Sequence, residues 1–452
     1  MSGLKAIILA AGEGKRMKSS LPKVLHRISG KPMLFYVMDA ANESGSEGIC
    51  VVLGEEAKEV KAAIENSGIE TVLQKERLGT GHAVMQAAGF IDDGFDYMVL
   101  YGDTPLLRGS TLSALWDFHK KSGSGVSLVS TFLDDPSGYG RIIRKNGEFE
   151  KIVEEKDTLP EEKAVKEINA GVYCFKGALL KAALLRLKND NAQKEYYLTD
   201  TVEILRQMGE KASVMPVCGH KEFNGVNSKS QLAYAALEMK RIINERHMDN
   251  GVTLADPEAT YIDFDVEIGE DTLIKPGCLI ESGTKIGSGC TIGPYSRLTN
   301  VKIGDNVNLS FTTAVDSKIG NGAKIGPYAY IRPNCDIGEN VKIGDFVEVK
   351  NSVIDTGTKV PHLSYVGDAD VGKNANFGCG TITVNYDGKT KHRTVAEDNV
   401  FIGCNTNLVA PVKIGENSYI AAGSTITHDV PENSLAVARA RQANIDGWVK
   451  KQ

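Results

Sequence analysis

An excess of positive charge is lacking in this 452-residue sequence, whose formal net charge at pH 7 is −6. No run of Lys and Arg is present to neutralise a phosphate backbone, which argues against a nucleic-acid partner. No stretch of about eighteen apolar residues is present to cross a bilayer. The segment from Met1 to Ala11 lacks the basic and then apolar pattern of a cleavable leader. We therefore expect a cytoplasmic protein with no membrane partner.

Paired cysteines are also missing. The eight cysteines stand singly, without a C-x-x-C pair, so free thiols are expected rather than disulfides or a zinc site. Cys278, Cys290 and Cys335 fall within a repeat and are expected to be small buried residues. The chain is too long for one compact core, so we expect two or more domains.

The C-terminal half is instead rich in isoleucine and valine at every sixth position. A helix and an ordinary strand both repeat differently, and this period predicts a parallel β-helix with about 18 residues in each triangular coil. The three registers of aliphatic residues are Ile268, Ile274, Ile280, Ile286, Ile292 and Leu298; Ile319, Ile325, Ile331, Ile337, Ile343 and Val349; and Ile402, Leu408, Ile414, Ile420 and Ile426.

Two kinds of irregularity interrupt this repeat. Shortened steps, such as Leu298 to Ile303 and Val315 to Ile319, predict trimmed corners. A longer break at about residues 378–400 predicts a loop that leaves the β-helix. Binding residues often lie on loops that leave a rigid repeat.

The N-terminal half begins with residues 4–11, which are apolar except for Lys5 and predict a buried strand. It leads into Gly12-Glu13-Gly14 and then to Arg16 and Lys23. Glycines let backbone amides approach a phosphate, and the basic side chains can offset its charge. The third glycine of a dinucleotide motif and the G-K-S/T of a P-loop are both absent, which disfavours those two classes.

Further strands are expected at 48–53, 70–73, 97–101 and 125–131, alternating with helices. This order predicts a mostly parallel α/β sheet that binds ligands at the carboxyl ends of its strands. Asp103 follows one such strand and could hold Mg²⁺ against a triphosphate. The alternative is that Asp103 only caps a turn or a helix.

Between the two halves, residues 228–247 have apolar side chains at helical spacing, and Ser228 is a plausible helix cap. We therefore expect an N-terminal domain at residues 1–227, a connecting helical arm at 228–250, and a β-helix with a C-terminal tail at 251–452.

The glycine-rich motif of residues 9–17 and the Leu-Pro-Lys of 21–23 look like the signature of sugar-phosphate nucleotidyltransferases. Together with the hexapeptide repeats, the chain resembles, almost end to end, the family of bifunctional N-acetylglucosamine-1-phosphate uridyltransferases and glucosamine-1-phosphate acetyltransferases. The resemblance implies an α/β nucleotidyltransferase domain with a Rossmann-like mixed sheet, followed by a left-handed parallel β-helix.

The resemblance also implies a site for UTP and the sugar nucleotide. Lys23 and Arg16 would be catalytic through charge neutralisation, Gln74 with Gly79 and Thr80 would read the uracil, and Asp103 with Asn227 would bind Mg²⁺. The reaction would be attack of a sugar-1-phosphate oxygen on the α-phosphorus of UTP. The implied binding residues are Leu9, Ala10, Ala11, Gly12, Lys23, Gln74, Gly79, Thr80, Tyr101, Gly102, Asp103, Gly140, Glu154, Asn169 and Asn227.

In the β-helix half, His362 is the candidate general base, because imidazole can accept a proton from an amine near neutral pH. The alternative is a solvated surface histidine. By resemblance, glucosamine-1-phosphate would bind Arg332, Lys350, Tyr365 and Asn376. Asn385 and Tyr386 would close this sugar pocket and contact acetyl-CoA, which would also lie against Cys379, Cys404, Ala422 and Arg439.

Cys379 and Cys404 depart from the small residues that the family pattern has there, which puts the acyl-donor contacts at these two positions in doubt. The resemblance further implies a homotrimer whose acetyl site takes residues from neighbouring chains. Two alternatives stay open at this point. One is a nucleotidyltransferase for another sugar phosphate with an inert β-helix, and the other is a noncatalytic scaffold, which would not need Arg16, Lys23 and Asp103.

Overall fold

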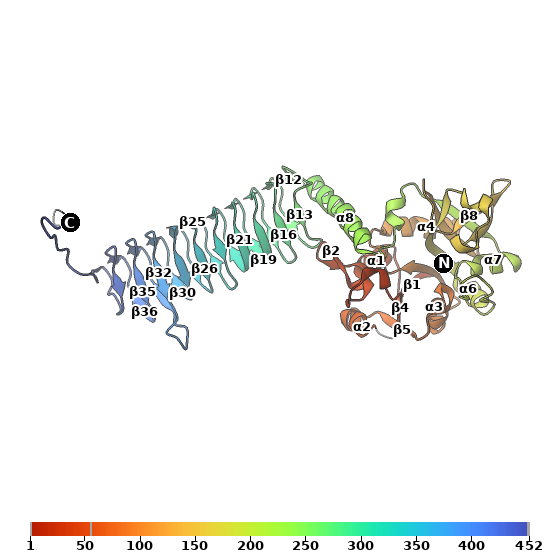
Figure 1. Ribbon diagram of the computed structural model, residues 1–452, viewed down its shortest axis with the longest axis horizontal. Coiled ribbons are helices and arrows are strands. Elements are labelled where there is room, and N and C mark those ends of the chain that lie inside the picture. Colours follow the sequence, from red (N-terminus) through yellow and green to blue (C-terminus); the bar gives the residue numbers. More distant parts are fainter. Residues whose placement is uncertain (1, 55–56, 450–452) are drawn as a thin grey trace. The chain divides into compact units, whose positions relative to one another are not determined.

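The computed structural model describes residues 2–54 and 57–449. The chain divides into two units, Met1–Met239 and Lys240–Gln452, which Figure 1 shows as an α/β unit and a β-helix. The boundary falls inside a helix, α8 (Lys229–Asp249). Each unit is described by itself below.

The first unit is built on a nine-stranded sheet in which β1 is an inner strand, between β6 and β4. Apart from Lys5, the β1 side chains from Leu4 to Ala10 are apolar and buried, as expected for a strand covered on both faces. The main order is β11-β7-β10-β6-β1-β4-β5, with β8 and β9 attached at β10. The strands are β1 (Gly3–Ala10), β4 (Ile49–Gly54), β5 (Glu70–Gln74), β6 (Phe95–Tyr101), β7 (Val126–Phe132), β8 (Arg141–Lys145), β9 (Glu148–Val153), β10 (Glu167–Lys176) and β11 (Ala212–Pro216), and β2 (Arg27–Ile28) and β3 (Lys31–Pro32) form a separate hairpin.

Helices cover both faces of this sheet and form two apolar cores. Leu34, Leu112 and Val60 come from α1, α4 and α2 and belong to one core. Val84 and Leu180 come from α3 and α6 and belong to the other, together with residues of α7. The helices are α1 (Met33–Glu43), α2 (Lys58–Ile64), α3 (Thr80–Gln86), α4 (Gly109–Ser122), α5 (Pro160–Lys163), α6 (Gly177–Leu184) and α7 (Asp200–Gln207).

The expected strands are confirmed to within two residues, but the sheet is mixed rather than mostly parallel. β1, β4, β5 and β6 are parallel, whereas β10 runs antiparallel to both β6 and β7. The hairpin of β8 and β9 is also antiparallel. The carboxyl ends of β1, β5 and β6 therefore lie at one edge, and the start of β10 reaches the same edge.

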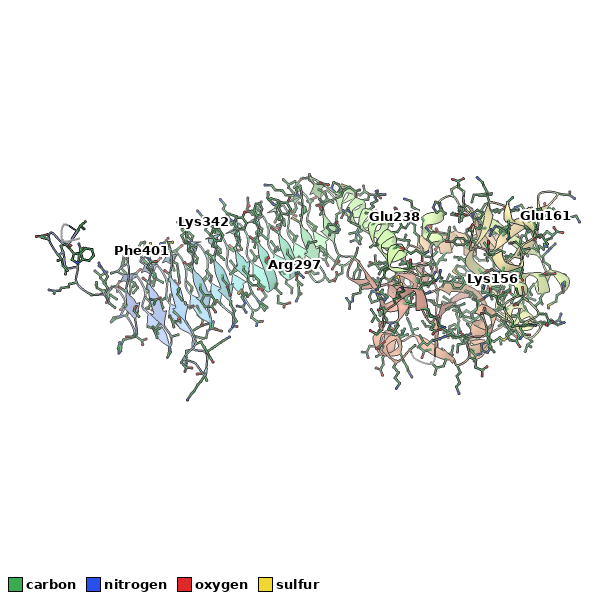
Figure 2. The ribbon with its side chains drawn as sticks, viewed as in Figure 1. Lys156, Glu161, Glu238, Arg297, Lys342 and Phe401 are labelled. Carbon is green, nitrogen blue, oxygen red and sulfur yellow. The ribbon has the colours of Figure 1, made fainter. Side chains whose placement is uncertain are left out.

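The second unit is a parallel β-helix, as the six-residue period predicts. Corresponding aliphatic residues stack in register, for example Ile274 on Ile292 and Ile325 on Ile343, and they are buried. One face is an eleven-stranded ladder of β12 (Thr253–Leu254), β15 (Leu273–Ile274), β18 (Thr291–Ile292), β20 (Asn308–Leu309), β22 (Lys324–Ile325), β25 (Lys342–Asp345), β28 (Lys359–His362), β31 (Asn376–Phe377), β34 (Phe401–Ile402), β37 (Tyr419–Ile420) and β39 (Leu435–Ala436). Lys342 and Phe401 project outward from it (Figure 2).

The other faces join into a seventeen-stranded sheet, because β19 and β21 run without a break across two corners. These are the corners that the shortened steps predict to be trimmed. The strands are β13 (Tyr261–Ile262), β14 (Glu267–Ile268), β16 (Leu279–Glu281), β17 (Lys285–Ile286), β19 (Arg297–Ile303), β21 (Thr313–Ile319), β23 (Tyr330–Ile331), β24 (Asp336–Ile337), β26 (Glu348–Lys350), β27 (Val353–Ile354), β29 (Tyr365–Gly367), β30 (Ala369–Val371), β32 (Ile382–Val384), β33 (Thr394–Ala396), β35 (Asn407–Val409), β36 (Val412–Ile414) and β38 (Thr425–Ile426).

Corners of the β-helix use the left-handed backbone region, where asparagine is tolerated better than most residues. Asn399, Asn417 and Asn433 occupy one such row, and their side-chain amides bond from coil to coil at 3.2 and 3.3 Å. Another corner carries aromatic residues with positive φ, and their rings stack. Tyr295, Phe311, Tyr328 and Phe346 form this aromatic ladder, with ring centroids 5.8, 5.1 and 5.4 Å apart.

The predicted break at residues 378–400 is too wide. The coil continues through β32 to Val384 and resumes in β33 at Thr394, so only residues 385–393 leave the β-helix. This segment is a small hairpin in which Tyr386 pairs with Lys391. The sequence does not predict the parts of the coil that flank this hairpin, because glycine and polar residues outnumber aliphatic ones there.

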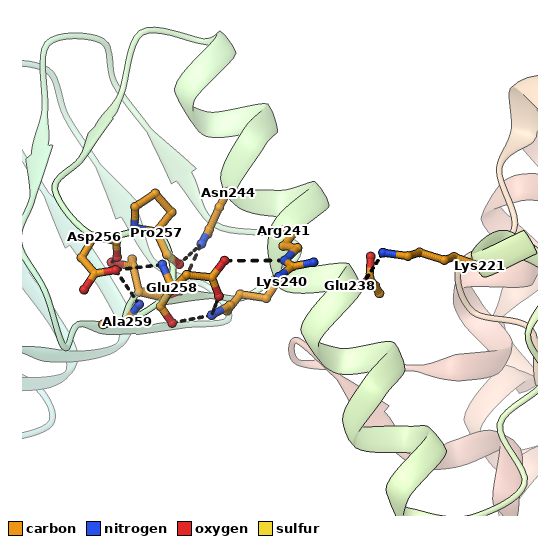
Figure 3. A network of polar contacts seen from close by, with 10 residues as sticks. Lys221, Glu238, Lys240, Arg241, Asn244, Asp256, Pro257, Glu258 and Ala259 are labelled. Atoms are coloured by element: carbon orange, nitrogen blue, oxygen red, sulfur yellow. Dashed lines mark hydrogen bonds and ion pairs between the residues drawn. The ribbon is translucent and has the colours of Figure 1, made fainter. Parts of the chain in front are cut away.

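The helix α8 contributes to both units. Ser228 caps it as predicted, since its hydroxyl accepts the Gln231 amide hydrogen at 3.2 Å. Within the first unit, Lys221 pairs with Glu238 at 2.9 Å. Within the second, Lys240 donates to the Glu258 carbonyl and Asn244 to the Pro257 carbonyl at 2.9 Å (Figure 3). The second half of α8 therefore covers the first coil of the β-helix.

The buried face of α8 differs from the one that helical spacing predicts, which consists of Leu232, Ala235, Ala236, Met239, Ile242 and Ile243. Ala235, Met239 and Ile243 are buried as expected, but Ile242 is 38% exposed. Polar residues are buried in place of further apolar ones. They are Lys240, Asn244 and His247.

Candidate active sites

A cavity of about 250 Å³ opens in the first unit at the carboxyl ends of β1, β5 and β6. The order of strands places the ends of β1 and β6 side by side, and the glycine-rich loop follows β1. Most residues predicted to bind the nucleotide line this cavity. They are Leu9, Ala10, Ala11, Gly12, Lys23, Gln74, Gly79, Thr80, Tyr101 and Asp103.

The glycine-rich loop lies directly on Lys23. Gly14 has a φ of 66°, and a Cβ added there would come within 2.9 Å of the Lys23 side chain. A Cβ on Gly12 would stand 3.7 Å from Lys23 Nζ. The two glycines therefore allow a backbone and an ammonium group to share one side of the cavity, which suits a phosphate.

Lys23 joins the two predicted metal ligands. Its Nζ donates to Asp103 Oδ2 at 2.5 Å and to Asn227 Oδ1 at 2.9 Å. Two oxygens that converge on one ammonium could equally face a divalent cation. A Cβ on Gly225 would reach 3.6 Å from both Asp103 carboxylate oxygens, so this glycine leaves space beside them. The donor set fits a hard cation that is completed by phosphate oxygens.

Gln74 has a fixed orientation at the base of the cavity. It is 4% exposed, and its Nε2 lies 3.1 Å from both the Gly79 carbonyl oxygen and His82 Nδ1. With the amide nitrogen held by these two acceptors, Oε1 remains to accept a hydrogen bond from a ligand. Thr80 Oγ1 accepts the Leu198 amide hydrogen at 3.1 Å, which ties α3 to the segment before α7.

The predicted sugar residues lie beside this cavity rather than in its lining. The Asn169 amide donates to the Gly140 carbonyl at 2.9 Å, and Thr199 Oγ1 donates to Glu154 at 2.9 Å. Burial raises the pKa of Glu154 despite the Thr199 hydrogen bond. Tyr101 lies between the cavity and the predicted sugar residues. Burial raises its pKa, and so do the nearby carboxylates of Glu154 among the sugar residues and Asp103 in the cavity.

Two predicted residues lie differently from the rest. Gly102 donates its amide hydrogen to the Leu9 carbonyl at 2.9 Å, so it holds β1 and the end of β6 together. Arg16 is exposed on the 3-10 turn Lys15–Met17 and is not in the lining of the cavity. Sequence reasoning missed Arg77 and Glu195, which both line it. Arg77 lies within the motif that contains Gln74 and Gly79. A positive charge in that motif could have indicated a residue that lines the nucleotide cavity.

In the second unit, His362 is bonded to a partner that sequence reasoning missed. Its Nδ1 lies 2.6 Å from Asp345 Oδ1, and because a carboxylate only accepts, Nδ1 donates. The two residues face each other in the register of β25 and β28. The His362 hydrogen bond lowers the pKa of Asp345. Asp345 precedes His362 by one shortened coil, which is the spacing that could have revealed it.

Basic residues gather on the neighbouring face. Lys350 lies close to Lys391, and this contact lowers the pKa of Lys391. Two ammonium groups in contact favour an anion between them. Arg332 lies one coil before Lys350, and its side chain pairs with Glu348 at 2.7 Å. Lys391 was missed because the sequence does not show that the 385–393 hairpin folds back over Lys350.

Tyr365 and Asn385 meet at the base of this hairpin. Asn385 Nδ2 donates to the Tyr365 hydroxyl at 3.2 Å and to Asp368 Oδ2 at 2.6 Å. Although burial opposes it, hydrogen bonds from Asn351 and Asn385 lower the pKa of Asp368. Tyr386 is 57% exposed on the hairpin. Asn376 lies in the eleven-stranded ladder opposite Lys359.

Four of the six predicted acetyl-CoA residues, all except Asn385 and Tyr386, form a row along one corner of successive coils. The Asn405 amide donates to the Cys379 carbonyl and the Gly423 amide to the Cys404 carbonyl, both at 2.8 Å. Arg439 packs over Gly423, with Cδ 3.7 Å from the position of an added Cβ. Cys404, Ala422 and Arg439 are exposed, and Cys379 is half-buried. An extended ligand could lie along this row.

Two further kinds of feature are absent from residues 2–54 and 57–449. Within those residues, no three His, Cys, Asp or Glu side chains gather closely enough to hold a metal by themselves. No helix there has the length and apolar content to cross a membrane. All eight cysteines are free thiols, as predicted.

Known protein families match both units. Residues 5–219 match the family described as Nucleotidyl transferase. Residues 265–300, 316–351 and 394–428 match Bacterial transferase hexapeptide (six repeats). Each match falls on the unit that has the corresponding fold.

Several relatives that match along the full length are named Bifunctional protein GlmU. The protein of Thermoanaerobacter pseudethanolicus (strain ATCC 33223 / 39E) is 55% identical over 453 residues, which cover 100% of this chain and 99% of that protein. The protein of Alkaliphilus oremlandii (strain OhILAs) is 53% identical and that of Clostridioides difficile (strain 630) is 51% identical. Both matches cover 99% of this chain and 98% of the relative.

Proposed function

This chain belongs to the family of bifunctional GlmU proteins, and from that premise we propose how its residues make UDP-N-acetylglucosamine. The protein is a bifunctional transferase. It transfers acetyl from acetyl-CoA to glucosamine-1-phosphate, and then uridylyl from UTP to N-acetylglucosamine-1-phosphate with release of pyrophosphate. The sugar-phosphate nucleotidyltransferase with an inert β-helix and the scaffold are set aside, because relatives along the whole chain are bifunctional by name.

Acetyl transfer would take place at His362. The sugar amine attacks the thioester carbonyl carbon, His362 accepts the amine proton through Nε2, and the C–S bond breaks to release CoA. Asp345 would hold the imidazole through Nδ1 and stabilise the imidazolium form. Arg332, Lys350 and Lys391 supply positive charge for the sugar phosphate. The bond between His362 and Asp345 is the observation that carries this assignment.

Uridylyl transfer would take place in the cavity of the first unit. A phosphate oxygen of the sugar phosphate attacks the α-phosphorus of UTP, a new P–O bond forms, and the bond to the β-phosphate breaks. Lys23 and the glycine-rich loop would position the triphosphate, and Gln74 would accept a hydrogen bond from the uracil. Arg16 is exposed and would contribute only as a flexible cation near the entrance.

The nucleotidyl transfer uses a divalent metal, and we propose that the metal is Mg²⁺. Asp103 and Asn227 would hold it, and Mg²⁺ would supply charge neutralisation for the triphosphate and for the departing pyrophosphate. Lys23 would then move from these two oxygens to the phosphates.

We also propose that the protein is a cytoplasmic homotrimer. The aromatic ladder supports self-association, because Tyr295, Tyr328 and Phe346 are between 54% and 67% exposed while stacked on one corner. His362 is likewise half exposed in a single chain, which suits a site completed by a neighbouring subunit. Replacing Tyr328 and Phe346 by Ser should yield monomers in sedimentation and lower acetyl transfer, whereas uridylyl transfer should persist. Wild-type monomers with full acetyl transfer would contradict the trimer.

The assignment of chain segments to activities follows from these sites. Residues 1–227 would hold the uridyltransferase, 228–250 the arm and 251–452 the acetyltransferase. Because Lys240 and Asn244 bond to the first coil, a fragment starting at 240 should unfold at higher temperature than one starting at 251.

One assay separates the two activities. Glucosamine-1-phosphate, acetyl-CoA, UTP and Mg²⁺ are supplied together, and free thiol and pyrophosphate are followed separately. Thiol release should proceed without UTP, and pyrophosphate release from glucosamine-1-phosphate should require acetyl-CoA. Pyrophosphate release at full rate without acetyl-CoA would contradict the proposed order.

A further inference from the structure

The glycine-rich loop of the first unit contains a negative charge where a triphosphate is expected to bind. Glu13 stands between Gly12 and Gly14, and its side chain is 43% exposed. A carboxylate next to phosphates disfavours their binding. The residues around Glu13 show how the chain accommodates this charge.

Two cations hold the Glu13 carboxylate. Arg77 Nη1 lies 3.2 Å from Glu13 Oε2, and Lys15 Nζ lies 3.0 Å from the same oxygen. Arg77 is the better placed, because its Nε also donates to the Ala11 carbonyl at 3.2 Å. A guanidinium that is fixed by a backbone carbonyl loses little freedom when it binds an anion.

Arg77 belongs to the nucleotide cavity as well as to this ion pair. It lines the cavity of about 250 Å³ together with Gly12, Lys23 and Gln74. It also lines a second cavity of about 310 Å³, to which Glu13 contributes as well. With Nε on Ala11 and Nη1 near Glu13, the Nη2 hydrogens remain for a further acceptor.

We propose that Arg77 is a phosphate-binding residue for UTP and that Glu13 is its internal competitor. This inference rests on the proposed uridylyl transfer. When UTP binds, the triphosphate takes the place of the Glu13 carboxylate on Arg77, and Glu13 turns to solvent. Glu13 thereby keeps Arg77 oriented in the empty site and raises the concentration of UTP needed to fill it.

Four proteins test this exchange by the KM for UTP in pyrophosphate release at low salt. Arg77→Gln should raise the KM about tenfold, and Arg77→Lys should recover part of the loss. Glu13→Gln should lower it about threefold, and salt should diminish the change because the pair is exposed. In the Arg77→Gln background, Glu13→Gln should change the KM less than about 1.5-fold, since only the exposed Lys15 then remains.

Two controls separate the possible failures. Acetyl transfer by the same proteins should stay constant and shows that they fold. Lys166→Gln removes another exposed ion pair of the first unit, with Asp134 at 3.0 Å, and should leave the KM for UTP unchanged. An Arg77→Gln protein with the wild-type KM would overturn the inference, as would an equal effect of Glu13→Gln with and without Arg77. A wild type that releases no pyrophosphate would instead overturn the proposed uridylyl transfer.

Discussion

The two sites of this protein are built in opposite ways. The nucleotide cavity lies within one unit, where loops after three strands enclose it, and Lys23 and Asp103 are only 11% and 15% exposed. The residues proposed for acetyl transfer lie on the outside of a β-helix, and the side chain of His362 is 56% exposed. An α/β sheet can make a pocket from its own loops, whereas a β-helix packs its interior with aliphatic residues and has only its surface to offer.

This difference affects how each site controls water. A partly enclosed site strengthens charge interactions by itself. An open surface must be covered by substrate or by another chain before its imidazole is desolvated. We therefore expect single substitutions in the first site to act within one chain, and those in the second to depend on assembly.

The largest expected effect is that of His362→Ala. Loss of a general base should lower kcat for acetyl transfer by about 10²- to 10⁴-fold. Pyrophosphate release from N-acetylglucosamine-1-phosphate should be unchanged, because the nucleotide cavity lies in the other unit. Loss of both activities would point to a folding defect, and loss of neither would remove His362 from the chemistry. Thiol and pyrophosphate assays on one preparation make the measurement.

Lys23→Ala should impair the proposed nucleotide site in the first unit. Removing the ammonium leaves Asp103 and Asn227 without their shared donor and takes a cation from the triphosphate. The rate of pyrophosphate release should fall at least about tenfold. Acetyl transfer serves as the internal control. Unchanged pyrophosphate release would show that Lys23 does not contact the nucleotide.

A substitution in the hairpin of residues 385–393 should have a smaller effect, on the KM for glucosamine-1-phosphate. Asp387 accepts hydrogen bonds from the Thr390 amide at 2.7 Å and from His392 Nε2 at 2.8 Å, and these bonds fold the hairpin that carries Lys391. Asp387→Asn should weaken them and raise the KM for glucosamine-1-phosphate about threefold to tenfold, with a smaller change in kcat. A change in kcat alone would contradict a role in positioning. Steady-state kinetics of thiol release give both values.

The pH dependence of stability should distinguish the two units, beginning with the first. Burial and the nearby Glu154 and Glu203 carboxylates raise the pKa of Asp200 to about 6, against about 3.9 in an unfolded chain. The folded state binds more protons between these values, so the unit loses stability as pH rises from about 4 to 6. Asp200→Asn should remove this slope and stabilise the unit by about 1 kcal/mol at pH 7.5. Urea unfolding followed by Trp116 fluorescence measures it.

The second unit should respond in the opposite direction over a similar range. Burial, and then the charge of Arg246, lower the pKa of His247 to about 4, against about 6.5 when unfolded. The unfolded state binds more protons between these values, so stability is lost as pH falls from about 6.5 to 4. His247→Gln should reduce this loss by about 1 kcal/mol in a fragment that begins at residue 240, as measured by circular dichroism in urea. An identical slope in wild type and variant would contradict the assignment.

The sequence predicts the fold of this protein well because both patterns are local. A six-residue aliphatic period depends only on neighbouring coils, and the strand before the glycine loop is apolar apart from Lys5. The alternation of strands and helices predicted a mostly parallel sheet, and only the family resemblance implied a mixed one, since the antiparallel pairing of β10 with β6 and β7 joins segments far apart in sequence. The extent of the hairpin was overestimated, because glycine-rich coils around residue 380 lack the aliphatic signal.

Candidate site residues could be predicted where they belong to a sequence motif. They could not be predicted where only the folded chain brings them to the site. Lys23, Asp103 and Asn227 belong to recognisable motifs, and the structure brings them together. Asp345 and Lys391 have no motif of their own, and they reach His362 and Lys350 only through the coil register and the folded hairpin. Arg77 lies inside a recognised motif, yet its bond to the Ala11 carbonyl depends on the placement of two loops.

The row of corner asparagines has a consequence for how such a chain can change in evolution. Each amide in the row of Asn399, Asn417 and Asn433 needs only an identical neighbour one turn above or below. Inserting or deleting a whole turn would restore the same pairing at the junction. The height of the column is therefore free to vary by increments of one turn, provided that the turns bearing the reactive side chains are left in place.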